Sequence, residues 1–332
     1  MALHAVDNLS DAYRATRSYL LPLEWGRWLR LSLLSLFVAG SSGGGAPTGS
    51  FQGPMSGSPD PVPGSGTSVG GLADQIGAML SANLLLVLGI IGFFIVVGLV
   101  LQWLAATFEF TFLESLRTDE VHVRQYTKQY SGLGTRLFAF RVLFGLLTLL
   151  FVGGTMFVVL FPLLAGVAPA GPLLIALFMV PLFLVFGVVA AVGYVFTTAF
   201  VAPIMLLEDR GVLSAWKRFW GVFKSAWTDF LVFVLVGLFL MIAIGIVVGI
   251  VMAVIGIGIA LPVIVALLAG GPLLAVFLAV PAAILALLAW ALVQVPVQTY
   301  LRHWALLVLG DIEPELDLIP DRRAAIRGET TS

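Results

Sequence analysis

The chain has 332 residues, of which 60% are hydrophobic and only 11% are charged. A soluble domain carries about 25% charged residues, so this chain has too few to cover a soluble protein of its length, and its composition predicts a protein that faces lipid. The net charge of -1 gives no basis for binding nucleic acid, and the absence of cysteine excludes disulfides, thiolate metal sites and cysteine nucleophiles.

Six apolar stretches follow one another along the chain, at about 29–40, 82–106, 137–165, 172–200, 230–262 and 272–301. Because about 20 apolar residues cross the hydrocarbon core of a bilayer, the last five stretches are long enough to span it. The sequence therefore predicts an all-α fold, a polytopic transmembrane helical bundle with about six spans.

The first stretch is short, and Arg27 and Arg30 stand directly before its apolar run from Leu31 to Gly40. It can cross the bilayer only if it tilts, if the bilayer thins or if the arginines snorkel. A second interpretation is a signal peptide, since small residues that resemble a cleavage site follow the run. The amphipathic pattern of the region before it favours the span.

The basic residues indicate the orientation in the membrane. All 17 lysines and arginines lie in four segments, at 14–30, 117–141, 210–224 and 302–327, and the connections at about 41–81, 166–171 and 263–271 contain none. The positive-inside rule then predicts a multi-pass protein of the cell membrane with both termini in the cytoplasm. Residues 41–71 are nearly all Gly, Ser, Pro and Thr, and we expect them to form a flexible external loop.

The chain contains an internal repeat. The peptide GPLLIALFMVP at 171–181 recurs as GPLLAVFLAVP at 271–281, with six of eleven positions identical. We therefore divide the single membrane domain into three similar units at 1–118, 119–209 and 210–311, followed by a polar cytoplasmic tail at 312–332. Each unit is predicted to hold an interfacial helix, an outward span and a returning span.

Short amphipathic helices are expected before the outward spans. Residues at spacings of three and four form one face of each helix: Leu9, Tyr13, Thr16 and Leu20 in the first, Val123, Tyr126 and Tyr130 in the second, and Leu213, Trp216, Trp220, Phe223 and Trp227 in the third. Such helices suit the headgroup layer. We expect the third to be anchored there by Trp216, Trp220, Trp227, Lys217 and Lys224.

The returning helices are too long for the membrane. From Pro172 to Glu208 the chain has 37 residues, which is about 55 Å of continuous helix at 1.5 Å per residue. We therefore expect the last turns, at 105–118, 195–208 and 297–310, to extend into the cytoplasm. There they could pack on the amphipathic helices.

Several polar residues lie near membrane depth, where such groups need partners and are candidates for function. Gln102 and Glu109 share one face of the second span, and Arg141 enters the third span from its cytoplasmic end. Together with polar residues of the sixth span they form a candidate cluster of Gln102, Glu109, Arg141, Gln294, Gln298, Arg302 and His303. The alternative is that these groups only form interhelical hydrogen bonds that stabilise the bundle.

Signatures of catalytic sites are missing from the sequence. It has no HExxH, no GxSxG and no GxGxxG motif in a strand context, and no pair of aspartates lies within the spans. The histidines lie on the expected cytoplasmic side, where we interpret them as interfacial residues and not as metal ligands. We therefore expect a non-enzymatic protein with no catalytic residue, no metal and no cofactor.

Two classes of function stay open. The first is a membrane protein that organises lipid or partner proteins at the cytoplasmic face. The second is a transporter or scramblase for an apolar or amphiphilic solute, favoured by Pro181 and Pro281, which occupy equivalent repeat positions at membrane depth. Membrane lipids are the expected partners; a protein partner or a homo-oligomer is left open, and nucleic acid is not expected.

The segment FVAPIMLLEDRGVLSAWKRFWGVFKSAW at 200–227 joins a span ending, an acidic pair with glycine and an amphipathic helix. This pattern resembles a group of prokaryotic six-span membrane proteins that includes the membrane domain of some glycerophosphodiester phosphodiesterases. The N-terminal NLSDAYRATRSYLLPLEWGRWLRL and the later TYLRHWALLVLGD resemble an uncharacterised, haloarchaeal branch of that group. The resemblance covers nearly the whole chain, implies a six-span membrane domain and brings no catalytic residues.

Overall fold

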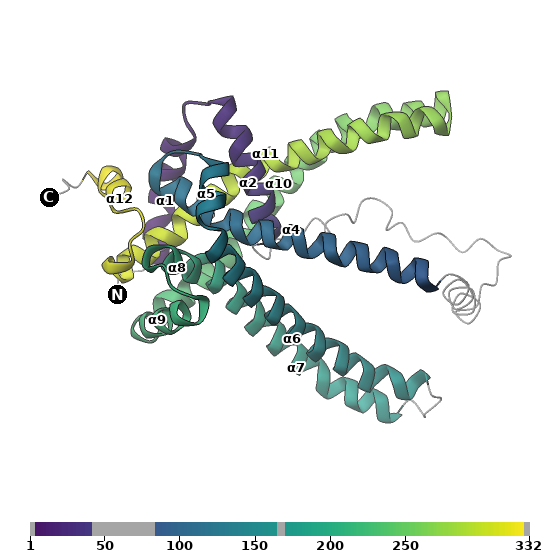
Figure 1. Cartoon of the computed structure of the whole chain (residues 1–332), viewed down its shortest axis with the longest axis horizontal. Coiled ribbons are helices and arrows are strands. Elements are labelled where there is room, and N and C mark those ends of the chain that lie inside the picture. The colour runs from purple at the N-terminus through teal and green to yellow at the C-terminus, as the bar shows by residue number, and fades with distance from the viewer. Residues whose placement is uncertain (1–3, 42–83, 165–169, 329–332) are drawn as a thin grey trace.

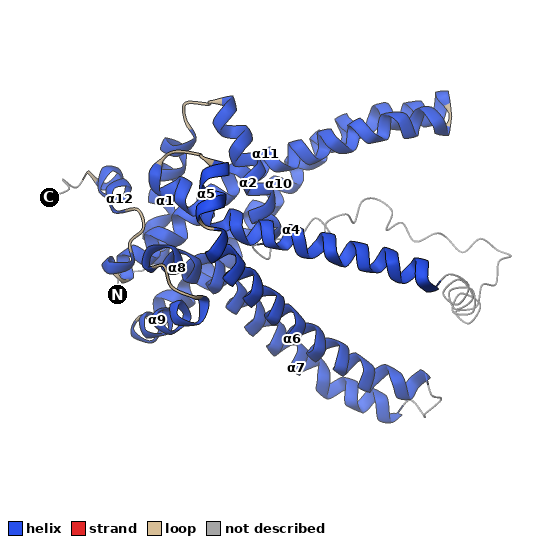
Figure 2. Cartoon of the chain, viewed as in Figure 1, coloured by secondary structure: helices blue, strands red, loops and turns tan. Residues whose placement is uncertain are grey.

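The computed structural model describes residues 4–41, 84–164 and 170–328, and within these ranges it contains helices and no strands (Figure 2). The elements in chain order are α1 (His4–Leu20), α2 (Trp25–Ser41), α4 (Leu84–Thr118), α5 (Val123–Gln129), α6 (Ser131–Leu164), α7 (Ala170–Phe196), the π-helix η2 (Thr197–Val201), α8 (Ala202–Glu208), α9 (Val212–Ser225), α10 (Trp227–Gly270), α11 (Pro272–Ile312), the 3₁₀-helix η3 (Pro314–Leu316) and α12 (Pro320–Arg327). The all-α expectation is thus confirmed.

The helices form a compact hub from which three arms diverge (Figure 1). The hub consists of α1, α2, α5, α8, α9, α12 and the ends of α4, α7 and α11 that meet them. The arms are the rest of α4, the pair α6 and α7, and the pair α10 and α11. Helices α1 and α12, the first and last elements of the described residues, lie on the hub side, away from the tips of the arms.

Five of the described helical segments are long and apolar enough to cross a membrane. They are Leu84–Thr118, Ser131–Val158, Leu177–Glu208, Trp227–Gly270 and Pro272–Ile312. At most 11% of the most apolar window of each is buried by the rest of the chain, so these windows present apolar side chains outward on most sides. Such surfaces are stable against lipid and not against water. The five helices are those of a membrane protein.

Helix α2 differs from these five, because it has 17 residues and a length of about 25 Å. It runs beside the hub end of α4: the ring centroids of Phe37 and Phe108 are 5.1 Å apart, and Arg30 donates to the carbonyl of Val121 over 3.3 Å. The described part of the first apolar stretch therefore packs against the hub and does not form an arm. The predicted external loop lies outside the described residues from residue 42 onward.

The predicted loop at 263–271 is wrong. Helix α10 continues to Gly270 and α11 begins at Pro272, so Gly271 makes the whole connection with a φ of 81°. A positive φ suits glycine because it has no Cβ, and Pro272 follows at the first position of a helix, where its missing N–H does no harm.

The core of the molecule lies in the hub. Its buried residues come chiefly from the ends of the three long helices that were expected to extend beyond the membrane, at 105–116, 196–206 and 302–309. Around them an aromatic cluster forms from Phe200, Phe219, Phe230 and Phe233, with the Phe200 and Phe219 rings stacked at 5.5 Å between centroids. Burying each such ring contributes about 2–3 kcal/mol, which fixes α9 and α10 against η2.

The faces by which α1 and α9 pack overlap the predicted stripes only in part. In α1 the predicted Thr16 and Leu20 are buried together with Ala5, Ala12 and Ala15, while Tyr13 is 60% exposed. Small residues allow the close approach in which Trp304 of α11 donates its indole N–H to the carbonyl of Ala5 over 2.8 Å. In α9 the buried face carries Val212, Ala215, Phe219 and Val222, which places the predicted tryptophan stripe to one side.

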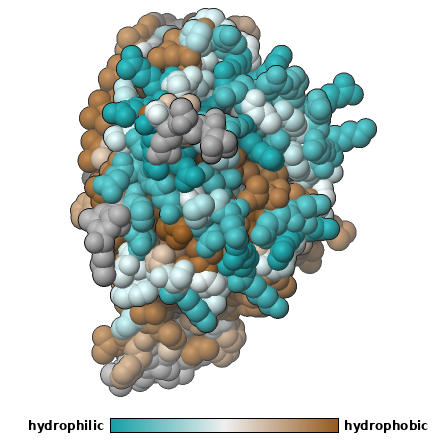
Figure 3. Space-filling view, turned by 90° about the vertical axis from the view of Figure 1, so that its left-hand side faces the viewer, coloured by the Kyte–Doolittle hydropathy of each residue, from teal (hydrophilic) through white to brown (hydrophobic). Residues whose placement is uncertain are grey.

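The outer face of the hub is largely polar. Figure 3 views the molecule from this end and shows hydrophilic residues over much of the face, with hydrophobic residues toward its edges. The hub and the arms thus differ in chemistry as well as in shape, as expected for a protein that meets water at one end and lipid along its arms.

Candidate functional site

Three buried charged residues meet where the arms join the hub. We call Glu109 of α4, Arg141 of α6 and Arg302 of α11 the arginine–glutamate triad. Arg141 Nη2 lies 3.5 Å from Glu109 Oε2, and Arg302 Nη2 pairs with the other carboxylate oxygen of Glu109. The side chains of Arg141, Glu109 and Arg302 are 2%, 0% and 6% exposed. The triad ties one helix of each arm together.

A backbone irregularity supplies a further partner for the triad. In the π-helix η2 the N–H of Ala202 bonds to the carbonyl of Thr197, so the carbonyl of Thr198 would next meet residue 203. That residue is Pro203, which has no N–H. The freed carbonyl accepts a 2.6 Å hydrogen bond from Arg302 Nη1, and the Thr198 hydroxyl lies 3.4 Å from Arg141 Nη2. Threonine and proline at this spacing therefore hold both arginines.

Close packing of α4 on α6 brings Glu109 and Arg141 together. A Cβ placed on Gly134 would stand 2.7 Å from the Cα of Thr107, closer than real side chains approach a backbone. Glycine at this position lets the backbones of the two helices approach closely. The contact lies two residues before Glu109 on α4 and two turns before Arg141 on α6. The absence of a Cβ at Gly134 thus permits the close packing of α4 on α6.

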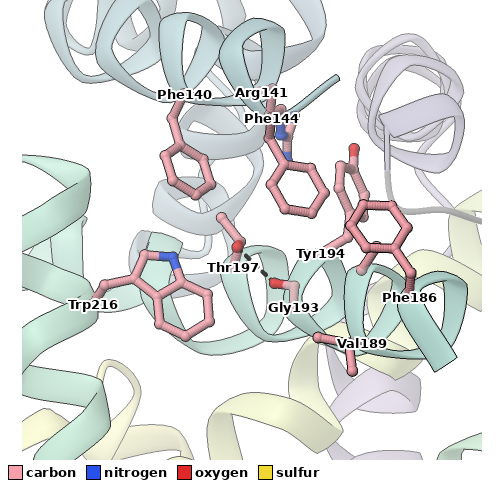
Figure 4. A pocket seen from close by; sticks show the side chains of 10 residues that line it. Phe140, Arg141, Phe144, Phe186, Val189, Gly193, Tyr194, Thr197 and Trp216 are labelled. Carbon is pink, nitrogen blue, oxygen red and sulfur yellow. Dashed lines mark hydrogen bonds between the residues drawn. The ribbon is translucent and has the colours of Figure 1, made fainter. Parts of the chain in front are cut away.

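A pocket of about 220 Å³ lies beside the triad, between α6, α7 and α9. Its walls are mostly aromatic and aliphatic: Phe140, Phe144, Phe186, Val189, Ala190, Gly193, Tyr194, Thr197 and Trp216 line it together with Arg141. Figure 4 shows the Arg141 and Tyr194 side chains on one side of the pocket and the indole of Trp216 on the other. The guanidinium carbon of Arg141 lies 5.4 Å from the centre of the Tyr194 ring.

The predicted polar cluster is brought together only in part. Glu109, Arg141 and Arg302 form the triad, and Gln294 and Gln298 contact each other on α11, with Nε2 of Gln298 3.5 Å from Oε1 of Gln294. Gln102 is half-buried on α4, two turns along the helix from Glu109. The periodicity of a single helix shows which of its residues share a face but not which neighbouring helix that face meets.

His303 lies apart from the triad and faces the other side of α11. Its Nδ1 is 3.3 Å from the hydroxyl of Thr16, and its Nε2 is 3.1 Å from Arg322 Nη1. The guanidinium of Arg322 also pairs with Asp119 and lies 4.9 Å from the centre of the Tyr19 ring. His303 thus belongs to the contact between α1, α11 and α12.

The predicted anchors of the third interfacial helix separate into two kinds. Trp220, Trp227, Lys217 and Lys224 lie on the surface, and Lys224 Nζ is 5.8 Å from the centre of the Trp220 ring. Trp216 is half-buried and belongs to the pocket wall. Sequence reasoning did not find Trp216, Tyr194 and Thr198 as parts of one site, because an aromatic residue at an interfacial position has the same pattern whichever way it points.

The two arginines of the triad can bind an anion but cannot exchange protons with it. An arginine keeps its proton at any physiological pH, so neither arginine can act as a general acid or base. Two guanidinium groups and one carboxylate leave the triad with one positive charge in excess. Within the described ranges no group of three His, Asp or Glu side chains could hold a metal ion.

Comparison with known proteins gives a single result. Searches of curated proteins and of solved structures find no match. One family model, described as a family of unknown function (DUF7544), matches residues 3–319. This match gives no support to the expected similarity to phosphodiesterase membrane domains or to the expected haloarchaeal origin. Since it covers nearly the entire chain, the protein belongs to the DUF7544 family.

Proposed function

We propose that this protein is a non-enzymatic, multi-pass membrane protein whose hub holds three helical arms apart and thereby organises lipid or partner proteins at the cytoplasmic face. The divergence of the arms is the observation that carries this proposal (Figure 1). Apolar arms that do not pack on one another have room for lipid or for the helices of another protein between them. The hub supplies the rigid frame that keeps them apart.

The distribution of charge supports the orientation. All 17 lysines and arginines lie in the four segments at 14–30, 117–141, 210–224 and 302–327, which belong to the hub or lie next to it. We therefore place the hub and both termini in the cytoplasm of a cell whose membrane the arms enter. Arms that start and end at the hub require an even number of crossings, which favours six spans over five.

The order of elements supports the threefold repeat. Each of the units 1–118, 119–209 and 210–311 has a shorter helix first and ends on a long helix that returns to the hub. In the first unit the outward crossing would follow α2. Because the chain has no cysteine, single cysteines at Ser42 and Ser65 can be labelled from outside intact cells. Labelling of both supports six spans, and protection of both contradicts them.

The second class, a transporter or scramblase for an amphiphilic solute, makes a different prediction for the arms. A path for a polar group needs side chains that can replace water along it. In α6 the hydroxyls of Thr148 and Thr155 bond to their own helix, to the carbonyls of Phe144 and Phe151 at 2.9 and 2.6 Å. These groups are already satisfied, which favours the organising role.

Two measurements separate the classes. Proteoliposomes containing the purified chain are compared with empty liposomes for lipid scrambling and for flux of an amphiphilic dye. A photo-crosslinking residue is also placed at Phe239 on the α10 arm and, as a matched control, at Leu213 on the hub; both sites are highly exposed. We expect no flux above empty liposomes, and lipid or membrane-protein adducts from position 239 in excess of those from 213. Reproducible flux would contradict the organising role.

A further inference from the structure

We propose that the pocket between α6, α7 and α9 binds the headgroup of an anionic phospholipid, with its phosphate at Arg141 and its acyl chains along the lipid-facing sides of α6 and α7. This inference rests on the proposed function only in placing the arms in a bilayer. It assigns a ligand to a site that the organising role by itself does not require.

The first argument is the balance of charge. The triad contains two guanidinium groups and one carboxylate, and all three side chains are nearly inaccessible. A buried charge without a counterion is strongly disfavoured. Glu109 can neutralise one arginine, so one positive charge is left over. A singly charged anion beside Arg141 would bring the site to neutrality.

The second argument is the set of hydrogen-bond donors without acceptors. Arg141 Nη2 is used by Glu109 and Thr198, whereas Arg141 Nε and Nη1 are buried and find no acceptor among the described residues. Trp216 Nε1, across the same pocket, is also buried and also finds no acceptor among the described residues. Buried donors are nearly always paired in folded proteins. Donors from two elements of one pocket call for an acceptor-rich ligand between them, and phosphate oxygens are acceptors only.

The third argument is the apolar surface around these donors. Phe140, Phe144 and Phe186 line the pocket, and Val189 beside them is 65% exposed. The pocket therefore borders directly on the apolar side of the second arm. A ligand that pairs with the buried donors and also covers the apolar side of the arm has a charged head and hydrocarbon chains. Tryptophan and arginine at the end of a span lie at the depth of lipid headgroups.

The lining also discriminates among headgroups. Arg141 is the charged residue of the pocket, and none of its lining residues is a carboxylate. The ammonium group of a zwitterionic lipid would find no counterion in it, whereas phosphatidylglycerol brings a single negative charge. Inorganic phosphate would bring the charge without hydrocarbon to cover the phenylalanine rings.

The test measures binding to the purified full-length chain in a neutral detergent. Native mass spectrometry and a fluorescence competition titration compare phosphatidylglycerol, phosphatidylcholine and inorganic phosphate. The variants are Arg141→Gln, which leaves the Glu109–Arg302 pair in place, and Trp216→Phe, which removes one N–H and keeps an aromatic ring. The matched controls are Arg136→Gln on the same helix and Trp25→Phe on the exposed surface of α2.

We expect phosphatidylglycerol to bind with at least about tenfold preference over phosphatidylcholine and over inorganic phosphate. Arg141→Gln should weaken it about tenfold or more, since it removes charge-assisted hydrogen bonds, and Trp216→Phe should weaken it about threefold, with both controls unchanged. If Arg141→Gln does not fold, Trp216→Phe decides. Equal binding of the two lipids, stronger binding of free phosphate, or equal losses in variants and controls would overturn the proposal. Lipid flux in proteoliposomes would contradict only the organising role.

Discussion

The carbonyl oxygen of Thr198 accepts a 2.6 Å hydrogen bond from Arg302, because Pro203 cannot donate the backbone hydrogen bond that this carbonyl would otherwise receive. A π-helix and a proline thus create an acceptor on η2 for a side chain of α11. Local widening of a helix of this kind is common at functional sites. Here it joins the second and third arms at the same point where Glu109 joins the first.

A double-mutant cycle on Glu109 and Arg302 should reveal strong coupling. Glu109→Gln leaves two buried arginines without their carboxylate and should lower the free energy of unfolding by about 3–5 kcal/mol. Adding Arg302→Gln removes one of those charges, so the double variant should lose about 1–3 kcal/mol less than the sum of the single losses. Unfolding in mixed micelles with increasing dodecyl sulfate measures all four proteins. Additive losses would show that the pair does not interact.

Two neighbouring glycines of α6 should respond in opposite directions to alanine. In Gly134→Ala the new Cβ meets the backbone of Thr107 at 2.7 Å, so the helices must separate, at a cost of about 1–3 kcal/mol. In Gly132→Ala the Cβ meets nothing within 4 Å, and the helix should gain up to about 1 kcal/mol from the better helix former. Thermal unfolding of the two variants beside the parent chain decides. Equal effects would mean that Gly134 does not set the crossing of α4 and α6.

Arg327 should hold the C-terminal helix α12 on the hub. It donates to Asp311 and to Asn8 over 2.8 Å and to Asp11 over 3.1 Å, and its hydrogen bond to Asp311 is the main reason that the pKa of Arg327 lies above its usual value. Arg327→Gln should weaken docking of α12 by about 1–2 kcal/mol at low salt.

The weaker docking of α12 in Arg327→Gln should be measurable as faster backbone hydrogen exchange across 320–327. The difference from the parent chain should shrink as salt is added, because the Arg327 side chain is partly exposed and its ion pairs are screened. Arg124→Gln is a suitable control, since Arg124 is exposed and has no ion pair among the described residues. Exchange that stays as slow as in the parent chain would show that other contacts hold α12.

Tyr19 should make the stability of the hub depend on pH in the alkaline range. Burial raises the pKa of Tyr19 above 10.0, and the nearby cations Arg27 and Arg322 offset only part of this rise. Above pH 10 the unfolded chain loses this phenolic proton while the folded chain keeps it. The folded state then binds more protons, so its stability falls as pH rises from about 10 toward the raised pKa.

The test compares unfolding of the parent chain and of Tyr19→Phe as a function of pH. At neutral pH the variant should lose about 1 kcal/mol, because the hydroxyl donates to the carbonyl of Ser115 over 3.2 Å. Above pH 10 its stability should fall less steeply than that of the parent chain. Parallel curves would show that Tyr19 ionises as readily in the folded chain as in the unfolded one.

Much of the candidate site was visible in the sequence as a set of residues and not as an arrangement. Glu109, Arg141 and Arg302 stand out because charge within an apolar run is rare and must have a partner. Which of the neighbouring polar residues joins them depends on how each helix is rotated about its axis. Helices such as α10 and α11 are apolar on nearly every side, so their periodicity does not tell which side faces a neighbour.

The sequence by itself determined the helical class, the apolar helices and the gathering of every basic residue in four segments, because these follow from composition and from order along the chain. Tertiary structure decided that the arms diverge, that Trp216 lines a pocket and that His303 turns away from the triad toward α12. It also decided that Arg302 meets Glu109 and Thr198, which lie far from it in the chain. Contacts of this kind depend on close approach at positions such as Gly134 and Ala5, where the packing of two helices selects one rotation among many with the same hydrophobic pattern.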